Sequence, residues 1–413
     1  MKIVHVITRL ICGGADENTV ISCNAQVREG HEIWLIYGAG SNPKMLAELT
    51  PQVRRLHLPS LQRDIAPASD ARALVELWRL ARAIRPDVIH THTSKAGTLG
   101  RIAGWLAGAP VLIHGVHILP FQNVGRTSRL LYLTIERALA GLTDAFIDVS
   151  EAMRDGNLAA HVGQPWQHHV VYSGMDCDRF RHAKPFARRA LCELLDDAAF
   201  AGSGKTPQIV LYAAAFEARK RHLDLLEAFA KVVEQAPSAK LLLLGEGPGM
   251  SAAESRAAAL GLSGHVHFLG HRSDIERWIA TADLCVFCSE REGLPRVAVQ
   301  YVMAGKPVVA TALPGLERVI RPGVSGYLVP LEHVGQMAEP MITLLKDDAR
   351  RRRFANAARD VDLGAWSSDR MTRAIEAIYS SASRARAREQ PCSARGSIPP
   401  RVASAEHEVG GLD

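Results

Sequence analysis

The sequence predicts an α/β fold of two Rossmann-like, doubly wound domains that face each other across a cleft. Short apolar runs alternate with amphipathic helical stretches, which is the pattern of βαβ units and parallel sheets. This alternation restarts after a Gly/Ser/Pro turn at 201–208. The chain has 413 residues, which is enough for two such domains.

The first half contains five predicted strands with helices between them. The strands are expected at 2–7, 32–38, 87–93, 110–117 and 145–150. The helices are expected at 15–29, 69–84, 95–108 and 125–141. The strand runs are almost continuously apolar, as expected for parallel strands buried on both faces. With the closing segment VVYSGMD, they predict an N-terminal domain over 1–175.

The second half repeats the pattern after a charged helix at 186–197. Its strands are expected at 209–215, 240–247, 265–270, 284–289, 306–311 and 326–330. Its helices are expected at 219–235, 250–260, 273–281, 295–304 and 333–346. The sequence therefore predicts a second domain over 176–365. A helix at 366–382 then crosses back to the first domain, and the polar segment 383–413 is predicted to be disordered.

The composition narrows the class of protein. The net charge of +6 is mild, and no basic stripe typical of nucleic-acid binding is present. A phosphate-bearing ligand or an anionic membrane surface suits such a charge. The seven Cys residues show no secreted spacing, which favours a reducing, cytoplasmic setting. The first residues form a strand rather than a signal peptide, and no apolar run is long enough to span a bilayer.

In open α/β sheets, ligands bind beyond the carboxyl ends of the strands. The loops at these ends are 9–16, 91–97, 117–124, 215–221, 245–250, 270–274 and 289–297. In the first loop, Gly13 and Gly14 allow close backbone approach, and the following helix start offers free N–H groups to an anion. A plain strand-to-helix turn is the alternative.

The last of these loops contains Glu292, Gly293, Leu294 and Pro295. Pro295 suits the first helical position, and Gly293 leaves the backbone amides open, so a diphosphate would be well placed there. Lys220, on the loop after the first strand of the second domain, is expected to face the same place. It could neutralise a departing phosphate. Solvent-exposed charges are the default interpretation of its two arginine neighbours.

Several other motifs raise alternatives. The segment AGSGKT lacks the first glycine of a P-loop, and the glycines at 245–249 match a dinucleotide fingerprint only in part. Cys285 and Cys288 lie in an apolar strand, which favours core packing over redox chemistry. The histidines at 90, 92, 114 and 117 suggest a metal, but no Cys or acidic partner has ligand spacing, so no metal is predicted. His117, at a strand end, is predicted to donate or accept a hydrogen bond in the cleft.

At this point the chain resembles the retaining glycosyltransferases of family 4, which have the GT-B fold. The resemblance extends to about residue 382 and rests on an ordered set of motifs. These include GGADEN, HTHTSKAGTLGR, VHILPF, VVYSGMD, RKRHLDLLEAF, SEREGLPR and AGKPVVAT. Within the family, the chain is most similar to enzymes of bacterial capsule, exopolysaccharide and O-antigen synthesis.

The resemblance implies a nucleotide-sugar donor, a UDP-sugar, held mainly by the C-terminal domain. Glu292 and the amides of Gly293 and Leu294 would contact the sugar and diphosphate, Lys220 the diphosphate, and Gln300 the ribose. His117 would hydrogen-bond the transferred sugar. The other implied donor contacts are Gly13, Gly14, Arg219, Gly247, Gly270, His271 and Pro295. No metal or cofactor is implied, since cationic groups and helix dipoles stabilise the leaving group.

A lipid-linked saccharide is the implied acceptor, on the side of the N-terminal domain. The implied contacts are His92, Ser94, Lys95 and Phe121. The stretch 123–142 places Arg126 and Arg129 among leucines, so it could lie on an anionic membrane, or pack as an ordinary surface helix. The lipid-linked acceptor favours peripheral association with the cytoplasmic face of the inner membrane.

Two positions depart from the family pattern. Gln300 replaces the second Glu of a Glu-x7-Glu pair, which should weaken donor binding by about 1 kcal/mol. Ala215 stands where the family has Arg, and such a cation contributes ~3–4 kcal/mol to a transition state. Arg219 or Arg221 could compensate. A nucleotide-sugar epimerase and a non-catalytic nucleotide-sugar-binding protein are the alternative functions.

Overall fold

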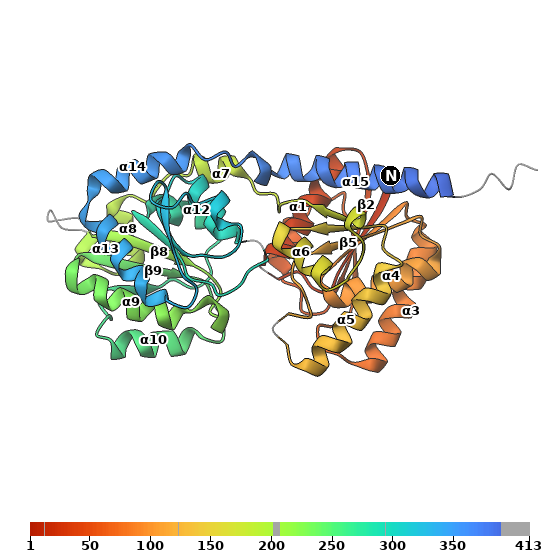
Figure 1. Cartoon of the computed structure of the whole chain (residues 1–413), viewed down its shortest axis with the longest axis horizontal. Helices are drawn as coiled ribbons and strands as arrows, with labels where there is room; N and C mark the ends of the chain where they lie inside the picture. Colours follow the sequence, from red (N-terminus) through yellow and green to blue (C-terminus); the bar gives the residue numbers. More distant parts are fainter. Residues whose placement is uncertain (12, 123, 201–206, 294, 390–413) are drawn as a thin grey trace, which may run out of the picture.

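The computed structural model describes residues 1–11, 13–122, 124–200, 207–293 and 295–389. Two parallel sheets, of seven and six strands, form two lobes that lie side by side (Figure 1). The predicted fold of two doubly wound domains is confirmed. The predictions for 201–206, Leu294 and 390–413 lie outside the described residues.

The N-terminal lobe is built on a sheet of strand order β3-β2-β1-β4-β5-β6-β7. Its strands are β1 Lys2–Ile7, β2 Glu32–Gly38, β3 Arg54–Leu58, β4 Val88–His92, β5 Val111–Val116, β6 Ala145–Asp148 and β7 His168–Val170. Its helices are α1 Gly14–Arg28, α2 Pro43–Ala47, α3 Pro67–Ile84, α4 Ser94–Ala107, α5 Arg126–Ala140 and α6 Glu151–Ala159. One face of the sheet packs on α1 and the C-terminal helix, and the other on α3 and α4.

The C-terminal lobe repeats this topology in the order β10-β9-β8-β11-β12-β13. Its strands are β8 Gln208–Ala213, β9 Ala239–Leu244, β10 Val266–Phe268, β11 Leu284–Phe287, β12 Val308–Thr311 and β13 Gly326–Val329. Its helices are α7 Cys177–Arg181, α8 Arg188–Leu195, α9 His222–Gln235, α10 Met250–Ala259, α11 Ile275–Thr281, α12 Arg296–Met303, α13 Ala338–Lys346 and α14 Asp348–Arg359. Two apolar clusters cover the two faces, and Cys285 and Cys288 are buried in them as predicted.

Some elements differ from the sequence prediction. β3 was not predicted because Arg54 and Arg55 are exposed at the sheet edge, which hides the apolar character of a strand. The short helix α6 and the arginine-rich α14 were also not predicted. The last helix, α15 Ser368–Glu389, continues beyond residue 382, so the tail predicted to be disordered from residue 383 begins in a helix.

Two chain crossings connect the lobes and lie next to each other. The amide of Met175 donates to the carbonyl of Trp366 at 2.8 Å, and Ser368 returns a bond to Met175 at 3.2 Å. From there α15 runs back over the N-terminal lobe (Figure 1), where Met371, Ile375 and Tyr379 enter its core. Among the described residues, none of the helices combines the length and apolar character needed to cross a membrane.

Candidate functional site

The carboxyl ends of the two sheets meet at a contact between Gly293 and His117. A Cβ atom on Gly293 would lie 2.1 Å from the carbonyl oxygen of His117, so any other side chain would force the lobes apart. The hydroxyl of Ser150, at the start of α6, donates to the carbonyl of Gly293 at 2.8 Å. The structure therefore shows a closed arrangement in which Gly293, in the loop after β11, touches the N-terminal lobe.

Arg296 connects the lobes at the same place. Its guanidinium pairs with Glu17 of α1 at 2.6 Å and donates to the carbonyl of Gly174 at 3.3 Å. A Cβ atom on Gly14 would lie 2.8 Å from Cδ of Arg296, so glycine at this position leaves room for the arginine side chain. Arg296 was not among the predicted site residues, although its place directly after Pro295 was a usable signal.

The C-terminal wall of the cleft holds a compact group of charges. Lys220 pairs with one carboxylate oxygen of Glu292, and Arg219 contacts the other oxygen at 3.1 Å. The side chains of Lys220 and Glu292 are each only 12% exposed. The hydroxyl of buried Tyr212 donates to the carbonyl of Lys220 at 2.9 Å and holds this loop in place. The structure thus brings together three residues predicted for donor binding.

The two arginines proposed to compensate for Ala215 behave differently. Arg221 turns away from the cleft, because it pairs with Asp224 at 2.6 Å and donates to the carbonyl of Leu331. Arg219 stays at Glu292, next to Lys220. Ala215 itself is exposed. Of the two candidates, Arg219 is therefore the one in position to replace the missing cation.

Close packing against the loop after β8 requires glycine at two positions after β9. Gly245 and Gly247 have φ angles of 137° and 155°, and a Cβ on either would meet the backbone of the loop at Ala214 or Phe216 within 3 Å. Gly270 lies beside this turn, where its carbonyl accepts from Gly245 at 2.8 Å. The exposed His271 donates its amide to Glu246 at 3.3 Å. These residues form one rim of the C-terminal wall.

The glycine loop after β1 already contains an anion. The carboxylate of Asp16 accepts from the amides of Ile11 and Gly13, each at 3.0 Å. Burial raises the pKa of Asp16 to about 6, against the opposing effect of these hydrogen bonds. An acid three residues beyond Gly13 therefore uses two amide groups of this loop that precede the helix start.

The start of α12 differs slightly from the prediction. Pro295 occupies the position before the helix, and Arg296 is the first helical residue, so the expected proline at the first helical position is displaced by one. Leu294 lies outside the described residues. Gln300 is buried, on the second turn of α12.

The N-terminal wall contains a row of histidines from adjacent strands. His5 of β1 is the register partner of His90 on β4, and His92 pairs with Gly115 on β5. Residues two apart on a strand share a face, so the three rings gather on one side of the sheet. His92 Nδ1 then lies 3.3 Å from Nε2 of His117 in the next loop.

These imidazoles are held in the neutral form. Burial lowers the pKa of His5 to about 4, and burial together with the charge of Arg296 does the same for His117. The pKa values of His90, His92 and His114 are also far below the usual value, mainly because the rings are buried. The row therefore acts through hydrogen bonds and not through charge.

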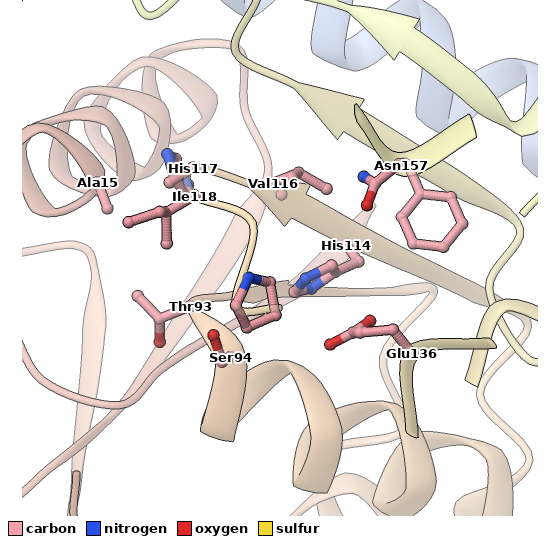
Figure 2. A pocket seen from close by; sticks show the side chains of 12 residues that line it. Ala15, Thr93, Ser94, His114, Val116, His117, Ile118, Glu136 and Asn157 are labelled. Atoms are coloured by element: carbon pink, nitrogen blue, oxygen red, sulfur yellow. The ribbon is translucent and has the colours of Figure 1, made fainter. Parts of the chain in front are cut away.

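A cavity of about 90 Å³ lies beside His117. Figure 2 shows the loop after β5, with His117 and Ile118, opposite Thr93 and Ser94 at the start of α4. Glu136 also lines it and pairs with the fully buried Arg101 at 2.7 Å. The cavity offers hydroxyl and imidazole groups next to the cleft.

The other residues predicted on the acceptor side are engaged elsewhere. Lys95 pairs with Asp70 of α3 at 2.6 Å. Phe121 is 3% exposed and belongs to the apolar cluster under α5 and α6. His92 is buried within the histidine row. Of the predicted acceptor contacts, Ser94 alone lines the cavity.

Nitrogen atoms of His5, His90 and His92 lie within 4.8 Å of one another, which is close enough to consider a metal ion. However, His5 Nδ1 and His92 Nε2 face each other at 3.0 Å in a hydrogen bond. A metal would have to replace this bond and the one from His5 to Gln26 at 2.7 Å. The ring nitrogens of His5 and His92 are therefore used in hydrogen bonds, and this arrangement does not favour a metal ion.

Comparisons with known proteins show which families the two halves of the chain match. Residues 196–361 match the family model described as Glycosyl transferases group 1, and residues 13–179 match Glycosyltransferase Family 4. EpsD of Bacillus subtilis is 32% identical over 252 residues, which cover 59% of this chain and 64% of EpsD. The UDP-Gal:alpha-D-GlcNAc-diphosphoundecaprenol alpha-1,3-galactosyltransferase of Escherichia coli is 24% identical, over 84% of this chain and 88% of that enzyme.

Solved structures share the fold. The crystal structure of Anabaena HepE in complex with UDP and glucose superposes with a TM-score of 0.77 at 21% identity, over 92% of this chain and all of HepE. WaaG, a glycosyltransferase involved in lipopolysaccharide biosynthesis, superposes with a TM-score of 0.71 at 17% identity, over 90% and 98% of the two chains. The chain thus has the GT-B fold of these proteins.

Proposed function

Because the chain belongs to the glycosyltransferases of the GT-B fold, we propose that it transfers a sugar from a UDP-sugar to a lipid-linked saccharide in bacterial cell-surface polysaccharide synthesis. The observation that carries this proposal is the cluster of Lys220, Arg219 and Glu292 next to Gly293, which contacts the carbonyl oxygen of His117 in the other lobe. HepE is described with UDP and UDP-glucose, and the E. coli relative is named for a diphosphoundecaprenol acceptor.

The donor binds with its diphosphate at the two cations. Glu217 pairs with Arg219, and Glu292 pairs with both Lys220 and Arg219. The diphosphate replaces the Glu292 carboxylate and frees it to accept hydrogen bonds from hydroxyl groups of the sugar. Gln300, on the second turn of α12, holds the ribose. The cations stabilise the departing UDP, so the reaction needs no metal.

The transfer proceeds with retention of the anomeric configuration. The bond between the anomeric carbon and the diphosphate oxygen breaks, while the acceptor hydroxyl forms a bond to the same face of that carbon. The acceptor proton passes to the departing phosphate oxygen, which balances the charge on UDP. The neutral His117 supports this path by orienting the sugar, since an uncharged imidazole adds no competing positive charge.

The acceptor approaches through the cavity beside Ser94 and from a membrane surface. α5 buries Leu133 and Leu139 against the lobe, as an ordinary surface helix does, but exposes Leu130 and Leu131 by 67% and 50%. The arginines at 126 and 129 are exposed on the same helix. Apolar and cationic groups together favour binding to anionic lipid headgroups at the cytoplasmic face of the inner membrane.

A panel of nucleotide-sugars, assayed for release of nucleoside diphosphate with and without membrane extract, tests the proposed function. Acceptor-dependent release of UDP from one donor is expected. Epimerised free donor would instead indicate an epimerase, and tight UDP binding without transfer or hydrolysis would indicate a non-catalytic binding protein. Co-sedimentation with vesicles containing anionic lipid tests the membrane step. Binding that does not weaken with salt would count against it.

A further inference from the structure

A chain of hydrogen bonds runs from the cleft into the core of the N-terminal lobe. It connects His117, His92, His5 and Gln26 through contacts of 3.3, 3.0 and 2.7 Å. We propose that Gln26 is a positioning residue that fixes His117 in the tautomer with the proton on Nε2, so that Nδ1 offers a lone pair to the cleft. The tautomer follows from the geometry, whereas its use on a donor sugar rests on the proposed function.

The direction of the chain is set at its inner end. The side-chain carbonyl oxygen of Gln26 lies 2.7 Å from Nε2 of His5. A carbonyl oxygen can only accept, so this nitrogen of His5 must hold the proton. A neutral imidazole holds one proton, and therefore Nδ1 of His5 is an acceptor.

The donors and acceptors of the next two hydrogen bonds, toward the cleft, follow in the same way. Because Nδ1 of His5 accepts, Nε2 of His92 at 3.0 Å is the donor. Nδ1 of His92 is then unprotonated and accepts from Nε2 of His117 at 3.3 Å. His117 thus retains its lone pair on Nδ1. Nδ1 of His117 has no hydrogen-bond partner in the part of the chain that the structure describes. It is not among the buried polar atoms that lack a partner, so it is accessible from the surface.

Two further contacts support the orientation of the Gln26 amide. Its NH2 group donates to the hydroxyl of Tyr379 on α15 at 3.4 Å, so both ends of the fully buried amide are used. The row also depends on a glycine at 115. A Cβ there would lie 3.1 to 3.2 Å from ring nitrogens of His90, His92 and His117 and would crowd the contact between the last two.

The chemical consequence concerns the donor sugar. A bare Nδ1 accepts a hydrogen bond, so His117 selects a sugar with a free hydroxyl group at the position facing it. A sugar with fluorine or a methyl ether at that position cannot donate and leaves the lone pair unpaired. His117 also has no proton to give from this nitrogen, so it orients the sugar and does not act as an acid toward the departing phosphate.

Nitrogen-15 NMR of the histidine rings tests the proposal without any activity assay. The His117 signals are identified by their loss in His117→Asn. In the wild-type protein we expect a protonated Nε2 and a bare Nδ1 on His117 at pH 7. In Gln26→Met, which removes the carbonyl with little change in volume, we expect both tautomers. A wild-type His117 protonated on Nδ1 would overturn the proposal, even if the variant does not fold.

A matched control separates this role from loss of packing. Gln167 is a second buried glutamine of the same lobe, and its amide bonds the carbonyls of Ala140 and Thr143, away from the histidine row. Gln167→Met should leave the His117 tautomer unchanged. An equal tautomer change in both variants would mean that Gln26 acts only through stability.

Kinetic measurements with a nucleotide-sugar that the protein turns over provide a separate test. Gln26→Met should lower kcat/KM by roughly two- to tenfold, the value of one hydrogen bond. Combined with His117→Ala, it should add no further loss, because both changes act through one nitrogen. Additive losses would contradict the proposal. If no donor is turned over, the proposed function fails while the NMR result still decides the tautomer.

Discussion

The two walls of the cleft differ in whether their titratable side chains carry charge. The C-terminal wall places full charges together, with Lys220 and Arg219 on the two oxygens of Glu292. The N-terminal wall places titratable rings together but keeps them neutral, since burial lowers the pKa values of His5, His92 and His117. Both walls stand at the carboxyl ends of parallel sheets of the same topology.

This difference follows from what each wall is proposed to bind. A diphosphate brings negative charge, and cations compensated by a displaceable carboxylate can exchange one anion for another. A sugar brings hydroxyl groups, which are recognised by the direction of hydrogen bonds rather than by charge. Positive charge in the histidine row would repel Arg296, which contributes to the low pKa of His117.

The largest expected effect tests the charged wall. Lys220→Ala should reduce turnover at saturating donor by about 10²- to 10³-fold, because a cation at the departing phosphate is lost. Steady-state release of UDP measures this. Arg221→Ala is the control, since its side chain pairs with Asp224 away from the cleft and its loss should change turnover little. Unchanged turnover in Lys220→Ala would remove the lysine from the mechanism.

The next effect tests the neutral wall through pH. His5 has a pKa of about 4 in the folded protein against the ordinary value of 6.5, so the unfolded chain binds more protons between these limits. Stability is therefore complete above pH 6.5 and falls as the pH drops toward 4. One such histidine costs about 2 kcal/mol by pH 5.

Urea unfolding at pH 7.5 and pH 5 measures this loss. His5→Asn should be less stable at pH 7.5 but should lose less free energy of unfolding between the two pH values than the wild type. His182→Asn, at an exposed position with a side chain 78% accessible, should behave as the wild type does. If His5→Asn keeps the full acid sensitivity, burial of that ring is not its source.

A smaller effect is expected at Gln300. Gln300→Glu restores a charged acceptor for the ribose hydroxyls and should strengthen UDP binding by about 1 kcal/mol, or roughly fivefold. Titration calorimetry with UDP measures the affinity. Gln235→Glu adds the same charge at an exposed end of α9 and should leave affinity unchanged. Weaker binding in Gln300→Glu would separate this position from the ribose.

The smallest effect concerns an ion pair between the lobes. Arg318 contacts Glu151 at 2.6 Å, but its side chain is 56% exposed, so Arg318→Ala should change the free energy of unfolding by less than ~1 kcal/mol. Arg296→Ala should cost more, since that side chain is 11% exposed and also donates to Gly174. Urea denaturation compares the two. A reversed order would mean that the closed contact at Arg296 adds no stability.

The sequence alone was sufficient for the fold of two doubly wound sheets and for the expectation that Lys220 faces Glu292. Lys220, Glu292 and His117 each follow a strand that an apolar run marks clearly, and parallel strands bring their carboxyl ends to one edge of a sheet. Edge strand β3 and helix α14 were missed because exposed arginines mask the apolar pattern at both. Local patterns thus determine which residues reach the cleft.

The tertiary structure alone decided which of these residues act on one another. No role was predicted from the sequence for His5, Gln26 or Arg296. Their partners lie far along the chain, 87 residues away for His5 and His92 and 279 for Arg296 and Glu17. A hydrogen bond acts only over about 3 Å and only in one direction. Strand register and lobe closure set those distances, and no local pattern encodes them.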